Sequence, residues 1–528
     1  MLVLGCGFIL IWQIGFAFNA DALDSDYRQG AASGSRHRYV CQFAYFYYYL
    51  RLFPVVTTHN RIQYSQEGAR DVLNNHGKTL YMDTPGYWAI RFGHFARAFM
   101  YLPDAIIKRV PWNRSTHPFT LSVHPATGTM FILALSGLYF AFWRAKFPIL
   151  GMFIVLLIGS NPFQLFEVYE NENVFGWSIT MATLVLAFNV PLILNKKPPK
   201  YWLWAAPVLS GCCLGAITHV RTEPALIGIS AALVCLTVAG TRWRVRVGLL
   251  VILAFSFVTV KSGLQRYFEH KIEEAAMVVE QAGGFPLPPE QYTTHGHWFP
   301  IWCGLGDFDE KYGYQWTDGV GYDYAVSILR KKYNIPIKGI RRSVIDGEYL
   351  DQAKRYPKKL ENMPEVRELM RDKVIHDVTT DPGWYADILS KRIKRIFSMN
   401  TPARLAWKKH SIDIPMHAVL LVPSVILLVF FRAWMPLKLV CFTLPLFVPA
   451  LCVFSGRGMT YYSCFHLILL AFYLALLLEG TLYLAARGYR RKEQYDIMGT
   501  TTTQLTQGIS RPKVRPRKRG LKVKAKHK

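Results

Sequence analysis

The sequence predicts an α-helical polytopic membrane protein with about ten transmembrane helices and a mixed external domain inserted after helix seven. The 528 residues are 51% hydrophobic and 14% aromatic, and the mean hydropathy is positive. The apolar residues come in blocks of about 20, the length of helix that crosses a bilayer core. Two long hydrophilic segments interrupt these blocks, and the second, 265–415, is long enough for a small domain.

Ten apolar stretches are expected to cross the membrane. The first has no basic residue ahead of it, and acidic residues follow it instead of a small-residue cleavage site. It is therefore expected to be a retained helix and not a signal peptide. The predicted spans are 1–19, 123–143, 147–165, 175–194, 202–220, 222–240, 246–264, 416–432, 436–454 and 461–486.

Basic residues alternate between the short loops and predict one orientation. Arg144 and Lys146 lie between spans two and three, whereas 160–174 has three glutamates and no Lys or Arg. Under the positive-inside rule the N-terminus is cytoplasmic and both long hydrophilic segments are external. The expected parts are the first helix 1–19, an external loop with juxtamembrane helices 20–122, helices two to seven 123–264, a periplasmic or lumenal domain 265–415, helices eight to ten 416–486, and a basic cytoplasmic tail 487–528.

The net charge of +27 does not predict a nucleic-acid partner, because basic residues gather on the cytoplasmic side of membrane proteins. The predicted spans hold almost no acidic residues in their middles, Glu479 being the main exception. Ion-coupled transporters place ionisable groups at mid-membrane, so this scarcity argues against a pump.

A cluster of carboxylates directly follows the first span, at its predicted outer end. Asp24 and Asp26 stand two residues apart, and Tyr27 comes next. The simplest explanation is a helix end that returns to water. A carboxylate at this position is also suited to act as a general base toward an acceptor hydroxyl.

Basic side chains that suit a phosphate group occur in two external segments. Arg91, His94 and Arg97 share one face of a helix predicted over 87–102, and Arg221 lies in THVRTEP. Arginine forms paired hydrogen bonds to phosphate oxygens, so these four residues are candidates to bind a lipid phosphate. The alternative for 87–102 is an amphipathic helix that only anchors the loop to anionic headgroups.

Further polar residues lie at predicted outer helix ends, where they would line a cleft beneath the external domain. Such a cleft suits a substrate that is half lipid and half polar. These supporting candidates are Glu170 and Glu172 in FEVYENEN, Glu223 in THVRTEP, and Arg457 in SGRGMTYY.

Glycines and aromatics dominate residues 295–324, which predicts a tight, irregular substructure. His297 in this stretch is a candidate substrate contact. Asp307 and Asp309 form a D-x-D pair that is suited to a divalent cation, although the further oxygen ligands of an EF-hand are missing. A structural role is favoured, because this short pattern is common.

Several of these motifs resemble those of the GT-C superfamily of membrane glycosyltransferases, which includes protein mannosyltransferases, aminoarabinose transferases and oligosaccharyltransferase catalytic subunits. LDSDY, residues 23–27, resembles the acidic motif that follows the first helix in that family, and YENENVFGWS resembles its second acidic motif before a helix. HVRTEPALIGISAAL resembles the Arg-x-Glu helix start of bacterial members. The sequence departs from the commonest pattern because Ser25, not Glu, follows Asp24, which leaves the choice between Asp24 and Asp26 open.

The resemblance implies a glycosyltransferase that inverts the anomeric centre, with a polyprenyl- or dolichyl-phosphate sugar as donor. Asp24 or Asp26 would be the base, and the acceptor would be a glycan, lipid or protein hydroxyl. Most members need no metal, so a divalent cation is only a candidate cofactor. The expected location is the bacterial inner membrane with the site on the periplasmic face, and the endoplasmic reticulum is the alternative. The rival functions are a non-enzymatic glycolipid carrier and an assembly subunit of an envelope complex.

Overall fold

The structure, a computed structural model, describes part of the chain. Its two units are Met1–Leu477 and Leu478–Lys528. The described residues are 2–18, 56–58, 80–82, 118–161, 164–165, 168, 175–195, 198–219, 223–281, 298–316, 318–332, 344–345, 358–359, 364–398, 403–407, 410–430, 434–446, 451 and 466–489.

The described residues are mostly helical, and their apolar helices indicate a membrane protein. Three helices are long and apolar enough to cross a membrane: Lys200–Thr218, Trp243–Val278 and His466–Tyr489. Seven shorter apolar helices overlap the other predicted spans: Leu2–Phe16, Gly128–Arg144, Pro148–Gly159, Ile179–Leu194, Ile227–Thr237, Leu421–Phe430 and Leu437–Leu446. The helical membrane class is therefore confirmed at this coarse level, and the number of ten spans stays a prediction.

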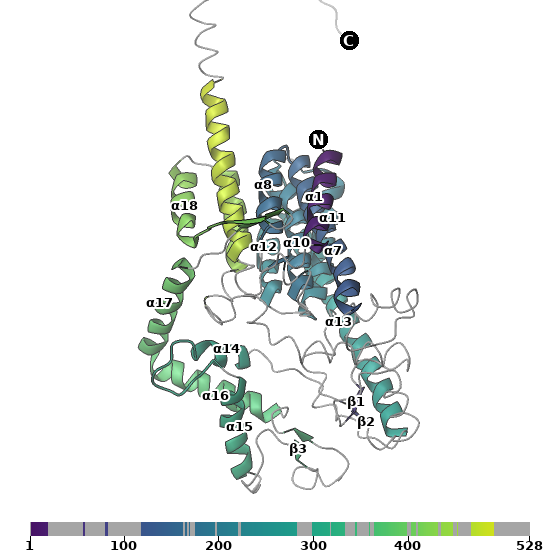
Figure 1. Cartoon of the computed structure of the whole chain (residues 1–528), viewed down its shortest axis with the longest axis vertical. Coiled ribbons are helices and arrows are strands. Elements are labelled where there is room, and N and C mark those ends of the chain that lie inside the picture. The colour runs from purple at the N-terminus through teal and green to yellow at the C-terminus, as the bar shows by residue number, and fades with distance from the viewer. Residues whose placement is uncertain are drawn as a thin grey trace, which may run out of the picture. The chain divides into compact units, whose positions relative to one another are not determined.

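Seven helices that come early in the chain form a bundle (Figure 1). They are α1 (Leu2–Phe18), α7 (Pro118–Arg144), α8 (Pro148–Gly159), α10 (Phe175–Leu194), α11 (Lys200–Thr218), α12 (Ile227–Thr237) and α13 (Trp243–Gln281). A tight turn joins α7 to α8. Lys146 in that turn takes a φ of 70°, in the left-handed region, and Pro148 then starts α8 with a backbone angle already suited to a helix.

Two glycines let α11 approach α13 closely. A Cβ atom at Gly211 would lie 2.6 Å from the Leu253 carbonyl oxygen, and one at Gly215 would lie 2.8 Å from that of Phe257. Small residues at such a seam allow two backbones to come together. Because both members of the pair advance by four residues, α11 and α13 run parallel, as the predicted alternation of spans five and seven requires.

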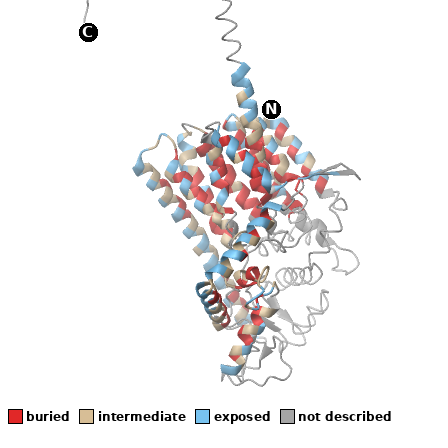
Figure 2. Ribbon diagram, turned by 90° about the vertical axis from the view of Figure 1, so that its left-hand side faces the viewer, coloured by how far each residue is buried: buried red, intermediate tan, exposed pale blue. Residues whose placement is uncertain are grey.

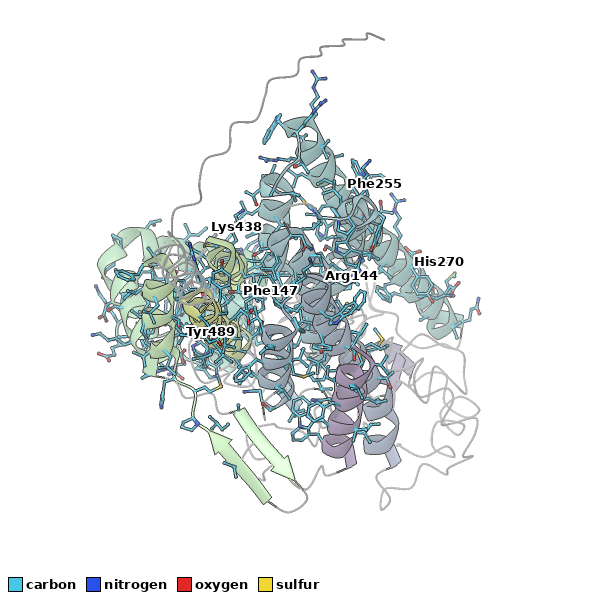
Figure 3. The ribbon with its side chains drawn as sticks, turned by 90° about the horizontal axis from the view of Figure 1, so that it is seen from above. Arg144, Phe147, Phe255, His270, Lys438 and Tyr489 are labelled. Carbon is cyan, nitrogen blue, oxygen red and sulfur yellow. The ribbon has the colours of Figure 1, made fainter. Side chains whose placement is uncertain are left out.

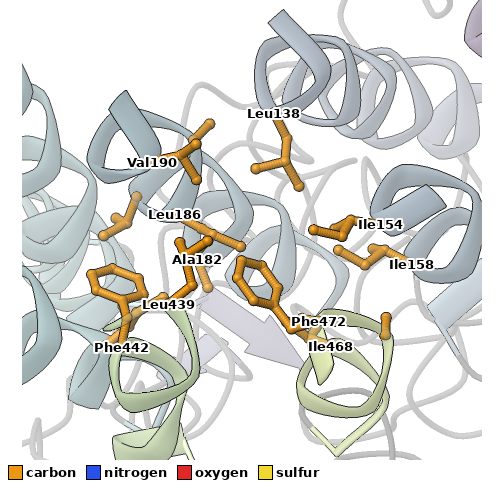
Figure 4. Close-up of a cluster of buried hydrophobic side chains, with 14 of the residues drawn as sticks. Leu138, Ile154, Ile158, Ala182, Leu186, Val190, Leu439, Phe442, Ile468 and Phe472 are labelled. Carbon is orange, nitrogen blue, oxygen red and sulfur yellow. The ribbon is translucent and has the colours of Figure 1, made fainter. Parts of the chain in front are cut away.

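The bundle encloses an apolar core and shows apolar side chains on its outside. Figure 2 shows buried residues concentrated between the helices. Val251 and Phe255 of α13 are 59% and 70% exposed, which suits a surface that meets lipid. Figure 3 labels Phe255 on this helix. Figure 4 shows part of the core, where the labelled side chains are Leu138, Ile154, Ile158, Ala182, Leu186, Val190, Leu439, Phe442, Ile468 and Phe472.

Helix α13 continues to Gln281, so the predicted external domain begins as an extension of a membrane helix. Four further helices share a second hydrophobic core that includes Trp302, Tyr314 and Met370. They are α14 (Trp298–Leu305), α15 (Asp318–Lys332), α16 (Pro364–Thr380) and α17 (Pro382–Ser398). A separate core is what an inserted domain requires.

The described strands form three short antiparallel pairs, β1 (Val56–Thr58) with β2 (Leu80–Met82), β3 (Val344–Ile345) with β4 (Lys358–Lys359), and β5 (Ala403–Trp407) with β6 (His410–Ile414). Apolar elements follow the last pair: η6 (Ala418–Leu420), α18 (Leu421–Phe430), α19 (Trp434–Thr443) and η7 (Leu444–Leu446).

Candidate functional site

Three of the predicted site residues lie among the described residues. Glu223 opens the short helix η3 (Glu223–Leu226), and Asp307 and Asp309 follow α14. The other predicted site residues lie outside the described ranges: Asp24, Asp26, Tyr27, Arg91, His94, Arg97, Glu170, Glu172, Arg221, His297 and Arg457.

A buried hydrogen bond joins α1 to the end of α8. Gln13 donates from Nε2 to the carbonyl oxygen of Gly159, the last residue of α8, over 2.9 Å. The last carbonyls of a helix have no partner inside it, so Gln13 satisfies one of them. The bond therefore ties α1, five residues before its last residue, to the end of α8.

Neutral polar side chains continue past this bond into the segment after α8. Ser160 donates to the Leu157 carbonyl oxygen over 3.4 Å, and the Asn161 Oδ1 accepts from the Gln164 backbone N–H over 3.0 Å. All of these side chains are buried. We call Gln13, Ser160, Asn161 and Gln164 the polar cap of the bundle.

The Gln164 side chain differs from the rest of the polar cap. It is fully buried, and both its Nε2 and its Oε1 have no hydrogen-bond partner in the structure as described. Asn189 in α10, by contrast, is a buried amide that has hydrogen-bond partners. Its Nδ2 donates to the Val185 carbonyl oxygen over 2.7 Å and to the Ser210 hydroxyl over 3.0 Å.

The carboxyl end of α11 is held to α13. The Nε2 of His219 lies 2.7 Å from the Lys261 carbonyl oxygen, and its ring packs edge-on against Phe268 with 5.7 Å between ring centroids. The helix η3 follows and contacts α10, α11, α12 and η7. Glu223 therefore starts a turn that is packed among helix ends.

Asp309 organises the loop between α14 and α15. Its carboxylate accepts backbone N–H bonds from Lys311 at 2.8 Å, Tyr312 at 3.0 Å and Tyr314 at 2.6 Å, and an indole N–H bond from Trp384 at 3.1 Å. An aspartate that gathers successive backbone N–H groups fixes a turn. The Trp384 bond ties this turn to α17.

Asp307 has a different partner from Asp309. The Asp307 Oδ1 lies 3.4 Å from Nη1 of Arg395, whose guanidinium stands 4.0 Å from the centre of the Phe308 ring. The two carboxylates of the D-x-D pair thus bind different internal groups, which favours their structural role. Within the described ranges, no group of three or more His, Cys, Asp or Glu side chains is placed to hold a metal ion.

An ion pair lies beside the aromatic core that α14 to α17 share. Lys373 Nζ is 2.6 Å from Asp377 Oδ2, and the Tyr314 hydroxyl donates to the same oxygen over 2.8 Å. The Lys373 ammonium also stands 4.8 Å from the Tyr314 ring centre and 5.6 Å from that of Tyr324. Burial, and next the bond to the Asp377 carboxylate, raise the pKa of Tyr314 well above its usual value.

The fold and these sites define a helical membrane protein with a second, aromatic-rich hydrophobic core. Comparison with protein-family models, with curated proteins and with solved structures gives no match. Sequence reasoning missed the polar cap because its residues are neutral and scattered among apolar ones. The Lys373–Asp377 pair has the i,i+4 spacing of a helical ion pair, but its partner Tyr314 is 63 residues away from Asp377 in the chain.

Proposed function

We propose that the protein is a GT-C-type glycosyltransferase with about ten transmembrane helices. It moves a sugar from a polyprenyl-phosphate donor to an acceptor hydroxyl at the external membrane face, in the bacterial inner membrane with the site on the periplasmic side. The observation that carries this proposal is the Gln13–Gly159 hydrogen bond. It supports the proposal because it ties α1, the helix before the Asp24–Asp26 segment, to the last residue of α8, the helix before Glu170 and Glu172.

The proposed reaction is a single displacement at the anomeric carbon. Asp24 or Asp26 takes the proton of the acceptor hydroxyl, whose oxygen attacks the anomeric carbon from the face opposite the phosphate. A bond forms between that carbon and the acceptor oxygen, the bond to the phosphate oxygen breaks, and the configuration inverts. Arg91, His94, Arg97 and Arg221 are the proposed partners of the phosphate, where negative charge grows in the transition state.

The test is to incubate the purified protein in detergent with radiolabelled polyprenyl-phosphate sugars and to measure donor consumption. Asp24→Asn and Asp26→Asn keep the size and capping ability of the side chain but remove the base. At least one should lower turnover by roughly 10²- to 10⁴-fold while donor binding is retained. The matched control is Asp323→Asn, which removes an exposed carboxylate on α15.

Three outcomes separate the proposal from its rivals. Loss of turnover in one aspartate variant but not in the control supports the transferase. Donor binding without consumption in the wild-type protein indicates the glycolipid carrier. Wild-type turnover in both variants would mean that the aspartates after α1 form only the end of a helix.

A further inference from the structure

Basic and aromatic side chains are exposed together where α11 and α13 begin. Both helices are long and apolar enough to cross a membrane. The exposed residues at their starts are Lys200, Tyr201 and Trp204 of α11, and Arg242, Trp243 and Arg244 at the start of α13. We call these six residues the basic–aromatic patch.

The packing of α11 on α13 brings the two halves of the patch to one end of the helix pair. His219 of α11 lies 2.7 Å from a carbonyl oxygen of α13 that is 42 residues further along the chain. Gly211 and Gly215 approach α13 carbonyl oxygens with the same offset. Since α11 and α13 run parallel, this offset sets Lys200 level with Arg242.

Internal hydrogen bonds hold the backbone that carries the patch. In the turn before α13, the Thr241 hydroxyl donates to the Val238 carbonyl oxygen over 2.9 Å and accepts from Nε of Arg246 over 3.1 Å. At the start of α11, the Trp202 indole N–H donates to the Phe188 carbonyl oxygen over 3.0 Å. A surface that is ordered in advance loses less conformational entropy when a ligand binds.

The patch carries positive charge without nearby acidic residues in the chain. No Asp or Glu occurs in 195–222 or in 224–268, so these segments supply no carboxylate to Lys200, Arg242 or Arg244. Ammonium and guanidinium groups form charge-assisted hydrogen bonds to phosphate oxygens. Trp and Tyr rings are enriched at the headgroup level of a bilayer. The composition of the patch therefore matches an anionic lipid headgroup.

An exposed apolar surface continues from the patch along both helices. Trp243 is 65% exposed, and Val247, Val251 and Phe255 follow it at intervals of four residues, exposed by 36%, 59% and 70%. Val208 is 39% exposed on α11. Residues four apart lie on one face of a helix. A nucleic acid or an acidic protein would leave this apolar surface uncovered, whereas the acyl chains of a lipid cover it.

We propose that the basic–aromatic patch binds the headgroup of an anionic phospholipid, whose acyl chains lie along the exposed apolar faces of α11 and α13. Lys200, Arg242 and Arg244 bind the phosphate oxygens. The orientation that the sequence predicts puts this end of the helices on the cytoplasmic side, where anionic lipids attract basic residues. The inference goes beyond the proposed function and does not depend on it.

The experiment measures equilibrium binding of two lipids to the full-length protein in detergent. The probes are phosphatidylglycerol and phosphatidylcholine with identical acyl chains. The wild-type protein should bind phosphatidylglycerol saturably and more tightly than phosphatidylcholine. Lys200→Gln/Arg242→Gln should lower the affinity for phosphatidylglycerol roughly 25-fold, because each basic residue near an anionic lipid contributes roughly 5-fold, and should leave the affinity for phosphatidylcholine unchanged.

Two further double variants separate a local site from general effects. Lys200→Arg/Arg242→Lys keeps both charges, so it should keep the preference for phosphatidylglycerol. Arg144→Gln/Lys438→Gln removes two exposed basic residues from other helices and should also keep it (Figure 3). Tm should be unchanged in all three double variants, because the replaced side chains are exposed.

Several results would overturn the inference. They are a wild-type protein without preference for phosphatidylglycerol, a Lys200→Gln/Arg242→Gln variant that keeps the preference, and an Arg144→Gln/Lys438→Gln variant that loses as much. Glycerol 3-phosphate and polyglutamate carry anionic groups without acyl chains, so they should bind far more weakly than phosphatidylglycerol. Equally tight binding of either one at the patch would identify a soluble anionic partner instead of a lipid.

Discussion

Replacing Asp377 with Leu should strongly destabilise the domain that α14 to α17 build, because the substitution leaves a buried ammonium without its carboxylate. The side chain of Asp377 is 7% exposed and that of Lys373 is 17% exposed. Asp377→Leu also takes the acceptor away from the Tyr314 hydroxyl. The aromatic rings around Lys373 attract its charge but accept no strong hydrogen bond from it.

The magnitude follows from the burial of the pair. Breaking a buried ion pair at one partner costs about 3–5 kcal/mol, and the partial exposure of Lys373 places this case at about 3 kcal/mol. That free energy raises the population of the opened domain roughly 100-fold. The double variant Lys373→Met/Asp377→Leu removes both charges together. Its opened population should therefore exceed that of the wild-type protein by less than about 10-fold.

The assay uses Cys303, which is 5% exposed in the same aromatic core. In a variant that keeps Cys303 as its sole cysteine, the rate of thiol labelling reports how often the domain opens. Asp372→Leu on the same helix is the matched control, because its ion pair with Arg371 is exposed to solvent and contributes little to stability. A double variant that labels as fast as Asp377→Leu would refute the reasoning.

Three further predictions concern the same domain and the α11–α13 seam. The unfolded domain releases the Tyr314 proton near pH 10, whereas the folded domain retains it. The free energy of unfolding should therefore fall by about 1.4 kcal/mol per pH unit above pH 10 because of this residue. Tyr314→Phe should flatten a plot of that free energy against pH. Asp309→Ala should speed Cys303 labelling roughly 10- to 100-fold, because the Asp309 carboxylate accepts hydrogen bonds from backbone N–H groups. Added Mn²⁺ should leave the labelling rates of the wild-type protein and the variant unchanged. Protection of the wild-type protein alone by Mn²⁺ would instead identify a cation site. Gly215→Leu should separate α11 from α13 and lower Tm by several degrees, whereas Gly248→Leu, at a site with nothing near its Cβ, should not.

The sequence was sufficient to predict the apolar helices, because a run of apolar residues marks such a helix without reference to the rest of the fold. Each predicted span overlaps an apolar helix, since a run of apolar residues must satisfy its backbone hydrogen bonds within itself in lipid. The extension of α13 to Gln281 was not predicted, because its polar part carries no membrane signal. The aromatic core was beyond prediction for a different reason, namely that Trp384 stacks on Tyr314 from 70 residues further along the chain.

In the candidate site, only charged residues could be predicted from the sequence. Asp309 was found as half of a D-x-D pair, but its role depends on backbone N–H groups that any sequence supplies. Gln13 and Gln164 give no signal by residue type, because their importance comes from burial and from which partner each one has. The aspartates after α1 stay a prediction.

Helix α13 is one continuous helix that starts in the bundle and extends well past the end of α11. From Lys261, beside the end of α11, to Gln281 it extends for about 30 Å at the helical rise per residue. A tilt of about 5° at the glycine seam would displace its far end by about 2.6 Å over that length. Because Gly211 and Gly215 lie where α11 packs on the α13 backbone, a change of a few degrees at this seam would be amplified along α13 into a displacement the size of a hydrogen bond at Gln281.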